Sequence, residues 1–86
     1  MTITKQTVAQ QIAAYLHHDI TLSQLVDWSE RALLDGELAE QDAETLSHVI
    51  ARLGVADVRA FGLAWEDCEE LLGKLGFAPR VEVVVA

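Results

Sequence analysis

Residues 20–36 read ITLSQLVDWSERALLDG, and they contain a helix whose start, apolar face and end are all visible. Thr21 is a favourable N-cap because its hydroxyl can accept a hydrogen bond from a backbone N–H, and Gln24 can complete a capping box. Gly36 is placed to end the helix in the left-handed conformation. At 100° per residue, one face is almost entirely apolar and comprises Leu22, Leu25, Val26, Ser29, Ala32 and Leu33. The pattern predicts an amphipathic helix over residues 22–35.

Three further segments carry similar apolar faces. A helix is predicted over residues 5–17, with Thr4 as its N-cap, and two more over residues 40–53 and 65–75. The last two segments share a pattern of an apolar residue, an alanine and acidic residues, and each ends on a basic residue, leucine and glycine. The repeated positions are Leu38, Ala39, Asp42, Glu44 and Leu46 in the first copy, and Leu63, Ala64, Asp67, Glu69 and Leu71 in the second. Acidic residues in a first turn and glycine after a last turn both favour helices with these bounds.

The C-terminal residues 80–85 are rich in valine, which favours a β-strand. The backbone N–H and C=O groups of a strand need a second strand to pair with, and the sequence leaves two candidates for that strand. One is residues 55–61, which fit either a short strand or a helical turn, and the other is the same strand in a second molecule. We expect a homodimer that pairs through the second route, with Val81, Val83, Val84 and Val85 at its interface.

The composition indicates a single domain over residues 1–86. The chain is 51% hydrophobic and 23% charged, with one proline, which is typical of a folded protein. Its single cysteine cannot form an internal disulfide, and no apolar run approaches the roughly 18 residues of a membrane span. The sequence therefore predicts a mainly α, small four-helix-bundle-like domain with a short C-terminal β-strand, located in the cytoplasm and away from membranes.

The charge is strongly acidic, with a formal net charge of −8. Between positions 27 and 44 there are seven acidic residues and one basic residue, Arg31. This field repels phosphate backbones, so we expect no direct binding to nucleic acid. It attracts a basic protein partner, although an acidic surface also keeps a small protein soluble with no further role.

The residues that could carry chemistry lack the required spacing. Adjacent His17 and His18 point about 100° apart on a helix, whereas two metal ligands on one helical face need i, i+4 spacing. Cys68 lies on an apolar face among acidic residues, which disfavours a reactive thiolate. The segment around Gly36 does not supply the oxygen ligands of a calcium loop, and the glycines are scattered singly rather than gathered in a phosphate loop. We therefore expect no metal, no cofactor and no catalytic residues.

These observations favour a protein-binding domain that is not an enzyme. In size and charge the chain is similar to antitoxins and bacteriocin immunity proteins, which mask basic nucleases with acidic surfaces. The partner surface is expected on the outer side of the helix over residues 22–35, at Asp27, Trp28, Glu30, Leu34, Asp35 and Glu37. One alternative is a small-molecule-binding protein or enzyme whose site lies at a dimer interface, using Tyr15, His17, His18 and Glu30. Another is an assembly subunit of a larger complex.

Overall fold

The computed structural model describes residues 2–59 and 62–78, and this part of the chain is mainly helical, as predicted. Its elements are β1 (Thr2–Ile3), α1 (Lys5–Leu16), α2 (Leu22–Asp35), β2 (Glu37–Leu38), the 3₁₀ turn η1 (Glu40–Asp42), α3 (Ala43–Gly54) and α4 (Trp65–Lys74). The strand expected over residues 80–85, with its four valines, lies outside the described residues. None of the helices in the described ranges combines the length and the apolar character needed to cross a membrane.

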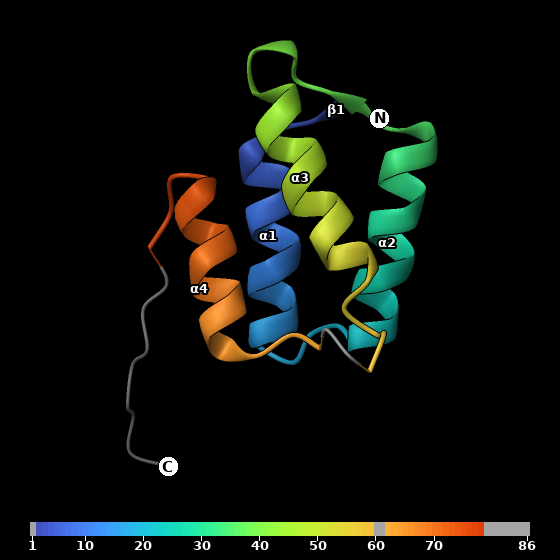
Figure 1. Ribbon diagram of the computed structural model, residues 1–86, viewed down its shortest axis with the longest axis vertical. Coiled ribbons are helices and arrows are strands. Elements are labelled where there is room, and N and C mark those ends of the chain that lie inside the picture. Colours follow the sequence, from blue (N-terminus) through green and yellow to red (C-terminus); the bar gives the residue numbers. More distant parts are fainter. Residues whose placement is uncertain (1, 60–61, 79–86) are drawn as a thin grey trace.

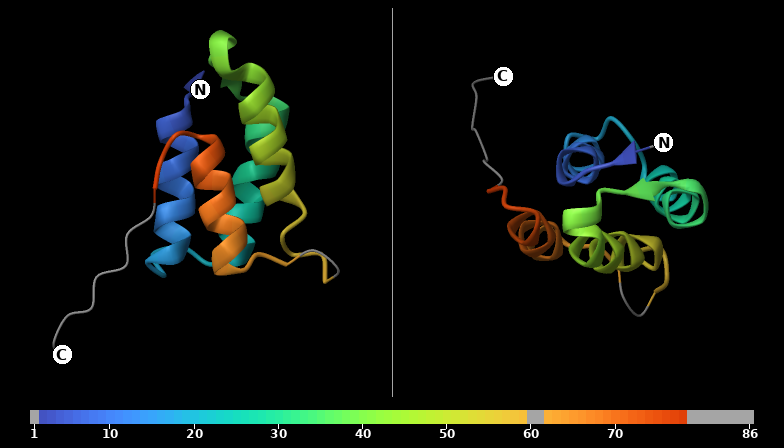
Figure 2. Two further views of the ribbon diagram at one scale, coloured as in Figure 1. Left: turned by 60° about the vertical axis from the view of Figure 1, so that its left-hand side comes forward. Right: turned by 90° about the horizontal axis from the view of Figure 1, so that it is seen from above.

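Consecutive helices run in opposite directions, so the end of α1 lies beside the start of α2 (Figure 1). Viewed from above, the helices enclose a shared interior, with α2 at one side of the arrangement (Figure 2). The packing is most extensive between α2 and α3, while α4 packs against both α1 and α3. Each amphipathic face therefore meets a partner helix, which is what stabilises short helices in water.

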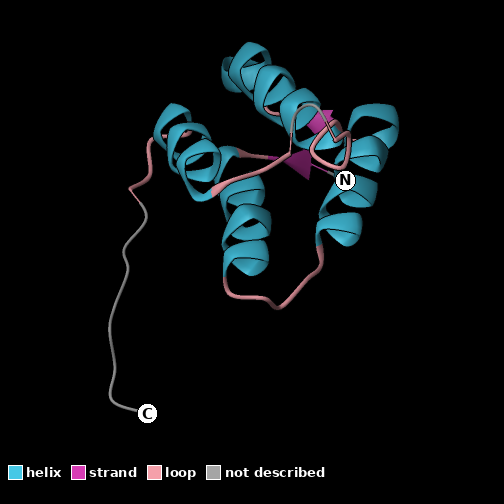
Figure 3. Cartoon of the chain, turned by 60° about the horizontal axis from the view of Figure 1, so that its bottom comes forward, coloured by secondary structure: helices cyan, strands magenta, loops and turns pink. Residues whose placement is uncertain are grey.

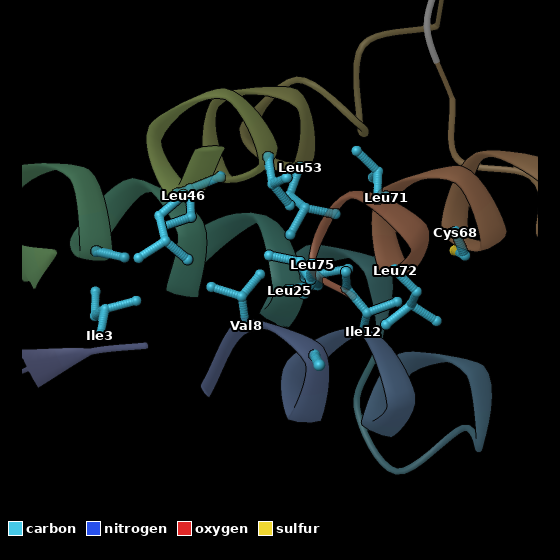
Figure 4. Packing of buried hydrophobic residues seen from close by; sticks show 14 residues of the cluster. Ile3, Val8, Ile12, Leu25, Leu46, Leu53, Cys68, Leu71, Leu72 and Leu75 are labelled. Carbon is cyan, nitrogen blue, oxygen red and sulfur yellow. The ribbon is translucent and has the colours of Figure 1, made fainter. Parts of the chain in front are cut away.

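The core is one continuous cluster of apolar side chains that extends from Ile3 of β1 to Cys68 on α4 (Figure 4). Buried members include Val8 and Ile12 from α1, Leu25 from α2, Leu46, Ile50 and Leu53 from α3, and Leu71 and Leu72 from α4. The buried polar residue Ser29 donates its hydroxyl to the Leu25 carbonyl oxygen at 2.9 Å. Because that hydroxyl is satisfied within its own helix, it does not interrupt the apolar interior.

A two-stranded parallel sheet, which the sequence did not reveal, joins the N-terminus to the segment after α2. Thr2 lies opposite Glu37 and Ile3 opposite Leu38. The Ala39 N–H also donates to the Ile3 carbonyl oxygen at 2.9 Å. Since the Ile3 side chain is fully buried, this short pairing fixes the connection between α2 and α3 onto the core.

The prediction that Gly36 ends α2 in a left-handed conformation is wrong. Its φ of −81° and ψ of 147° are extended, because the chain continues directly into β2. A Cβ atom at this position would collide with Ile3 Cδ1 and would lie 2.6 Å from the Ala32 carbonyl oxygen. Glycine is required here by close packing rather than by backbone conformation.

Two other helices end with left-handed residues. α4 is followed by Gly76 at φ 87°, and the Phe77 N–H donates to the Leu72 carbonyl oxygen at 2.9 Å, which is the hydrogen bond of a Schellman cap. α1 ends in the same way, but its left-handed residue is His18, at φ 63°. Gly54, predicted to follow the third helix as a cap, is instead the last residue of α3 and has no positive φ.

Three local predictions are corrected by packing. Leu33, placed on the inward face of α2 by periodicity, is 47% exposed because it lies at the edge of that face near the end of the helix. The helix expected from residue 40 begins with η1, and α3 starts only at Ala43. Residues 55–59 form turns, so the strand alternative for this segment is wrong over those residues.

Candidate functional site

The outer side of α2 carries the most exposed apolar side chain among the described residues, that of Leu34, which is 82% exposed. Its neighbour Leu33 is 47% exposed. Glu30 precedes them by three and four residues, so it lies one turn away on the same patch of helix surface. We call the exposed set the α2 outer surface, and it consists of Asp27, Glu30, Arg31, Leu33, Leu34, Asp35 and Glu37, with Arg31 as its one basic side chain.

Five of the six residues predicted at the partner surface belong to this exposed set. Asp27, Glu30 and Leu34 follow one another at intervals of three and four residues, which places them along one side of α2. Asp35 ends the helix, and Glu37 opens β2, where its side chain is also exposed. The edge position of α2 leaves this side uncovered by the other helices (Figure 2).

The sixth predicted residue, Trp28, is placed differently. Its side chain is half-buried and packs against the hydrophobic core. At 100° per residue it lies next to the buried Leu25 and Ala32 on the helical wheel, which explains this contact. Trp28 therefore borders the core and contributes less exposed area than Leu34.

The acidic residues that follow β2 extend the negative surface toward α3. Glu40 and Glu44 are exposed. Asp42 is partly buried, and its Oδ1 atom lies 3.4 Å from the Lys5 Nζ atom of α1. One of the seven acidic side chains between positions 27 and 44 is thus paired within the fold.

A second feature is a surface hollow of about 170 Å³ where the end of α1 meets the start of α4. The connections of this end of the molecule are turned toward the viewer in Figure 3. The hollow is lined by Tyr15, Leu16 and His18 on one side and by Leu63, Ala64 and Trp65 on the other. We call it the aromatic hollow, because three of these six residues carry aromatic rings.

Both walls of the aromatic hollow are held by backbone hydrogen bonds. On the α1 side, the Asp19 N–H donates to the Ala14 carbonyl oxygen at 2.8 Å, and the His18 N–H donates to the Tyr15 carbonyl oxygen at 3.1 Å. On the α4 side, the Ala64 N–H donates to Asp67 Oδ2 at 2.8 Å. The hollow therefore forms between two capped helix termini rather than between loose loops.

Arg52 connects the second wall to α3. Its Nη1 donates to the Gly62 carbonyl oxygen at 3.1 Å, and its Nη2 lies 3.5 Å from Asp67 Oδ2. The same Asp67 carboxylate thus caps α4 and pairs with α3. This arrangement fixes the direction in which Leu63 and Trp65 enter α4.

A third feature is a charged groove of about 160 Å³ between α3 and α4, lined by His48, Arg52, Asp67, Glu70, Leu71 and Lys74. The Lys74 Nζ atom lies 3.6 Å from Glu70 Oε1, and Arg52 pairs with Asp67. Partly exposed pairs of this kind contribute little stability. The cationic side chains of the groove are matched by carboxylates of α4, so the groove has no excess of either charge.

The single cysteine, Cys68, lies inside the hydrophobic core. Cys68 is fully buried, and burial together with the neighbouring Asp67 charge raises the pKa of its thiol, while the Arg52 charge opposes this. Across residues 2–59 and 62–78, no group of three histidine, cysteine or acidic side chains is arranged to hold a metal ion. A buried thiol with a raised pKa is a poor nucleophile.

Within one chain, two of the four residues named for the alternative site at a dimer interface line the aromatic hollow. Tyr15 and His18 line the aromatic hollow, whereas His17 is not among its lining residues. Glu30 belongs to the α2 outer surface, nearer the other end of α2. The four side chains do not converge on one site in the described part of the chain.

Several residues of these surfaces were missed by sequence reasoning. Leu33 was assigned to the core, and Leu63 and Trp65 carried no recognisable signal of a shared hollow with Tyr15. A hollow can form where the end of one helix lies beside the start of another, and both termini are visible in the sequence. Which helices are neighbours, however, depends on tertiary packing.

Comparison of this chain with protein-family models, curated proteins and solved structures finds no match.

Proposed function

We propose that this domain binds a basic partner protein through the α2 outer surface, as an antitoxin- or immunity-like protein would. The observation that carries the proposal is the exposure of Leu34, at 82%, within a cluster of carboxylates. A single exposed leucine is common on protein surfaces, but here a second exposed leucine, Leu33, lies about 100° around the same helix, with Glu30 one turn earlier between them. Exposed apolar side chains interspersed with charged groups can serve as a protein interface.

The charge of this surface favours a basic partner over a second copy of the chain. In a symmetric dimer through the α2 outer surface, the carboxylates of Asp27, Glu30, Asp35 and Glu37 outnumber the single cation of Arg31, so two surfaces with an excess of negative charge would meet, which disfavours association. Lysine and arginine side chains would instead neutralise these carboxylates. They would also accelerate association at low ionic strength.

The wider hypothesis concerns the architecture of the domain, its location in the cell and its C-terminal residues. We propose a four-helix-bundle-like domain in the cytoplasm whose residues 80–85 form a strand. In this hypothesis the strand pairs with its copy in a homodimer, through Val81, Val83, Val84 and Val85.

The test is affinity capture from the lysate of the native cell, followed by direct binding measurements on each purified captured protein. We expect a basic protein to bind at low salt and to bind more weakly as the salt concentration rises. Leu34→Ser should weaken this binding by about tenfold, the size expected for a central interface residue. The double variant Asp27→Asn, Glu30→Gln should reduce the salt dependence as well as the affinity.

The control variants change exposed side chains outside this surface. Val58 is 46% exposed and Glu69 is exposed, so Val58→Ser and Glu69→Gln should leave binding unchanged. Thermal unfolding should show that Leu34→Ser keeps the stability of the wild type, because the side chain is almost fully in solvent. Equal losses for the control variants, or a partner that is itself acidic, would contradict the proposal.

A further inference from the structure

The aromatic hollow is too small for most cofactors or metabolites. Sites for drug-sized ligands enclose about 300–1,000 Å³, whereas this hollow encloses about 170 Å³. It has room for the end of one side chain or for a small ion. Its occupant is therefore expected to be a single chemical group presented by another molecule.

The walls of the hollow combine aromatic and aliphatic surface. Tyr15, His18 and Trp65 supply aromatic rings, and Leu16 and Leu63 supply aliphatic groups. Trp65 is 38% exposed, so part of its indole surface remains open to a ligand. Among the described lining residues there is no lysine or arginine that would repel a cation.

Two exposed carboxylates follow lining residues of the hollow directly in the sequence, Asp19 after His18 and Glu66 after Trp65. The cation on the α4 side, Arg52, is engaged by the Asp67 carboxylate and the Gly62 carbonyl oxygen. Aromatic faces attract cations through their negative electrostatic potential, and nearby carboxylates add to this attraction. An uncharged aliphatic side chain would use only the leucine surface and would leave the acidic border unmatched.

We propose that the aromatic hollow binds the guanidinium group of an arginine side chain presented by another protein. Guanidinium is planar and weakly hydrated, and it stacks on aromatic rings more readily than a lysine ammonium does. The caps on α1 and α4 hold the two walls in place before binding, which lowers the entropic cost of association.

This inference does not rest on the proposed function. The hollow lies at the end where α1 leads into α2, whereas Leu34 lies near the opposite end of α2 (Figure 1). A partner could be lost from the α2 outer surface while the hollow still binds arginine. The reverse is also true, so the two proposals can fail separately.

The experiment titrates N-acetyl-arginine amide into the ¹⁵N-labelled protein and follows chemical shifts in two-dimensional NMR spectra. We expect saturable shifts of the Trp65 indole N–H and of the backbone amides of Leu16, His18 and Leu63. The affinity of one isolated side chain should be in the millimolar range, at about 1–10 mM. The matching citrulline derivative has the same shape without the charge and should bind at least about fivefold more weakly.

Two protein variants and one control assign the binding to the hollow. Trp65→Leu and Tyr15→Leu should each reduce the affinity for the arginine derivative by about fivefold or more. Trp28→Phe, which changes the other tryptophan, should leave it unchanged. The thermal unfolding of each variant is measured first, and Trp65→Leu is the safer variant because its side chain is partly exposed.

Three outcomes would overturn the inference. The first is equal binding of the citrulline and arginine derivatives, which would remove the role of the charge. The second is tighter binding of N-acetyl-leucine amide, which would identify the hollow as an apolar side-chain pocket. The third is the absence of any saturable shift at the hollow up to about 100 mM ligand, tenfold above the expected range.

Discussion

Among the described residues, His18 is the non-glycine residue with a positive φ. At 63°, its backbone lies in the left-handed region that side chains with a Cβ rarely adopt. The conformation persists because the His18 and Asp19 N–H groups both donate to carbonyl groups in the last turn of α1. The strain at this residue is therefore offset by a completed helix cap.

The first prediction concerns this strain. His18→Gly should increase the free energy of unfolding by about 0.5–1 kcal/mol, because glycine adopts the left-handed region at little steric cost. His17→Gly is the matched control, since His17 has a φ of −85° and gains nothing from glycine. Urea denaturation of both variants would measure the difference. An equal loss of stability in the two variants would show that the cap does not strain His18.

Gly36 shows how a residue can be required for a reason that its neighbours in sequence do not reveal. Its φ is negative, so an alanine could adopt the same backbone angles. Two obstacles occupy the space where a Cβ atom would lie, the Ala32 carbonyl oxygen in the last turn of α2 and the end of the Ile3 side chain. The second obstacle comes from a residue more than thirty positions away, and it follows from the pairing of β1 with β2.

At the scale of whole elements, the repeated sequence before α3 and α4 produces two different helix starts. At α4 the N–H of Ala64 donates to Asp67, and the helix begins directly at Trp65. At the equivalent place before α3, the N–H of Ala39 donates to Ile3. Asp42, the counterpart of Asp67, pairs with Lys5 instead of capping a helix.

This difference has a physical cause in the sheet. Because β1 accepts the Ala39 N–H, the carboxylate of Asp42 has no cap donor to bind at that position. The chain passes through η1 before α3 begins at Ala43. Two local sequences that share five of nine positions therefore form different structures, since only one of them meets a strand.

The second prediction follows from the half-complete cap of α4. Ala64 has the extended backbone of an N-cap but no side-chain oxygen to accept the N–H of Asp67. Ala64→Ser should supply that acceptor and raise the free energy of unfolding by about 1 kcal/mol. Ala39→Ser is the control, and no comparable gain is expected there because η1 follows it. Chemical denaturation would contradict the explanation if the two substitutions had equal effects.

At the scale of the whole molecule, stability depends on the single cluster of apolar side chains that all four described helices share (Figure 4). Cys68 is part of this cluster and is fully buried. Burial raises the pKa of its thiol in the folded state, whereas the unfolded chain exposes the same thiol to water. Folding therefore favours the protonated thiol.

The third prediction is a pH dependence of global stability. The contribution of Cys68 is fully present below the ordinary thiol pKa of about 8.5 and is lost as the pH rises toward the higher pKa of the folded state. Cys68→Ala should cost about 1 kcal/mol near pH 7, where it removes buried sulfur. The difference in unfolding free energy between wild type and variant should become smaller between pH 8 and pH 10.

Urea denaturation under reducing conditions at several pH values would measure this change. All other titratable groups are common to both proteins and cancel in the comparison. Parallel curves for wild type and Cys68→Ala would show that the thiol has the same pKa in the folded and unfolded chains. That result would contradict the effect of burial.

The sequence by itself determined where the helices form. The two threonine caps, the apolar periodicity and the glycine after α4 act through hydrogen bonds and contacts within a few residues, so they are visible locally. The bounds predicted for α1, α2 and α4 agree with the structure to within one residue at each end. Five of the six residues expected at the partner surface were also correctly identified as exposed.

Only the tertiary structure decided how these helices are joined and which of their surfaces meet. The pairing of β1 with β2, the role of Gly36, the exposure of Leu33 and the aromatic hollow all depend on segments that are distant in sequence. Periodicity specifies the direction in which a side chain points from its own helix axis. It does not specify whether a neighbouring helix extends far enough to cover that side chain. For that reason the sequence could predict the apolar face of α2, while the packed fold determined how much of Leu33 and Trp28 it covers.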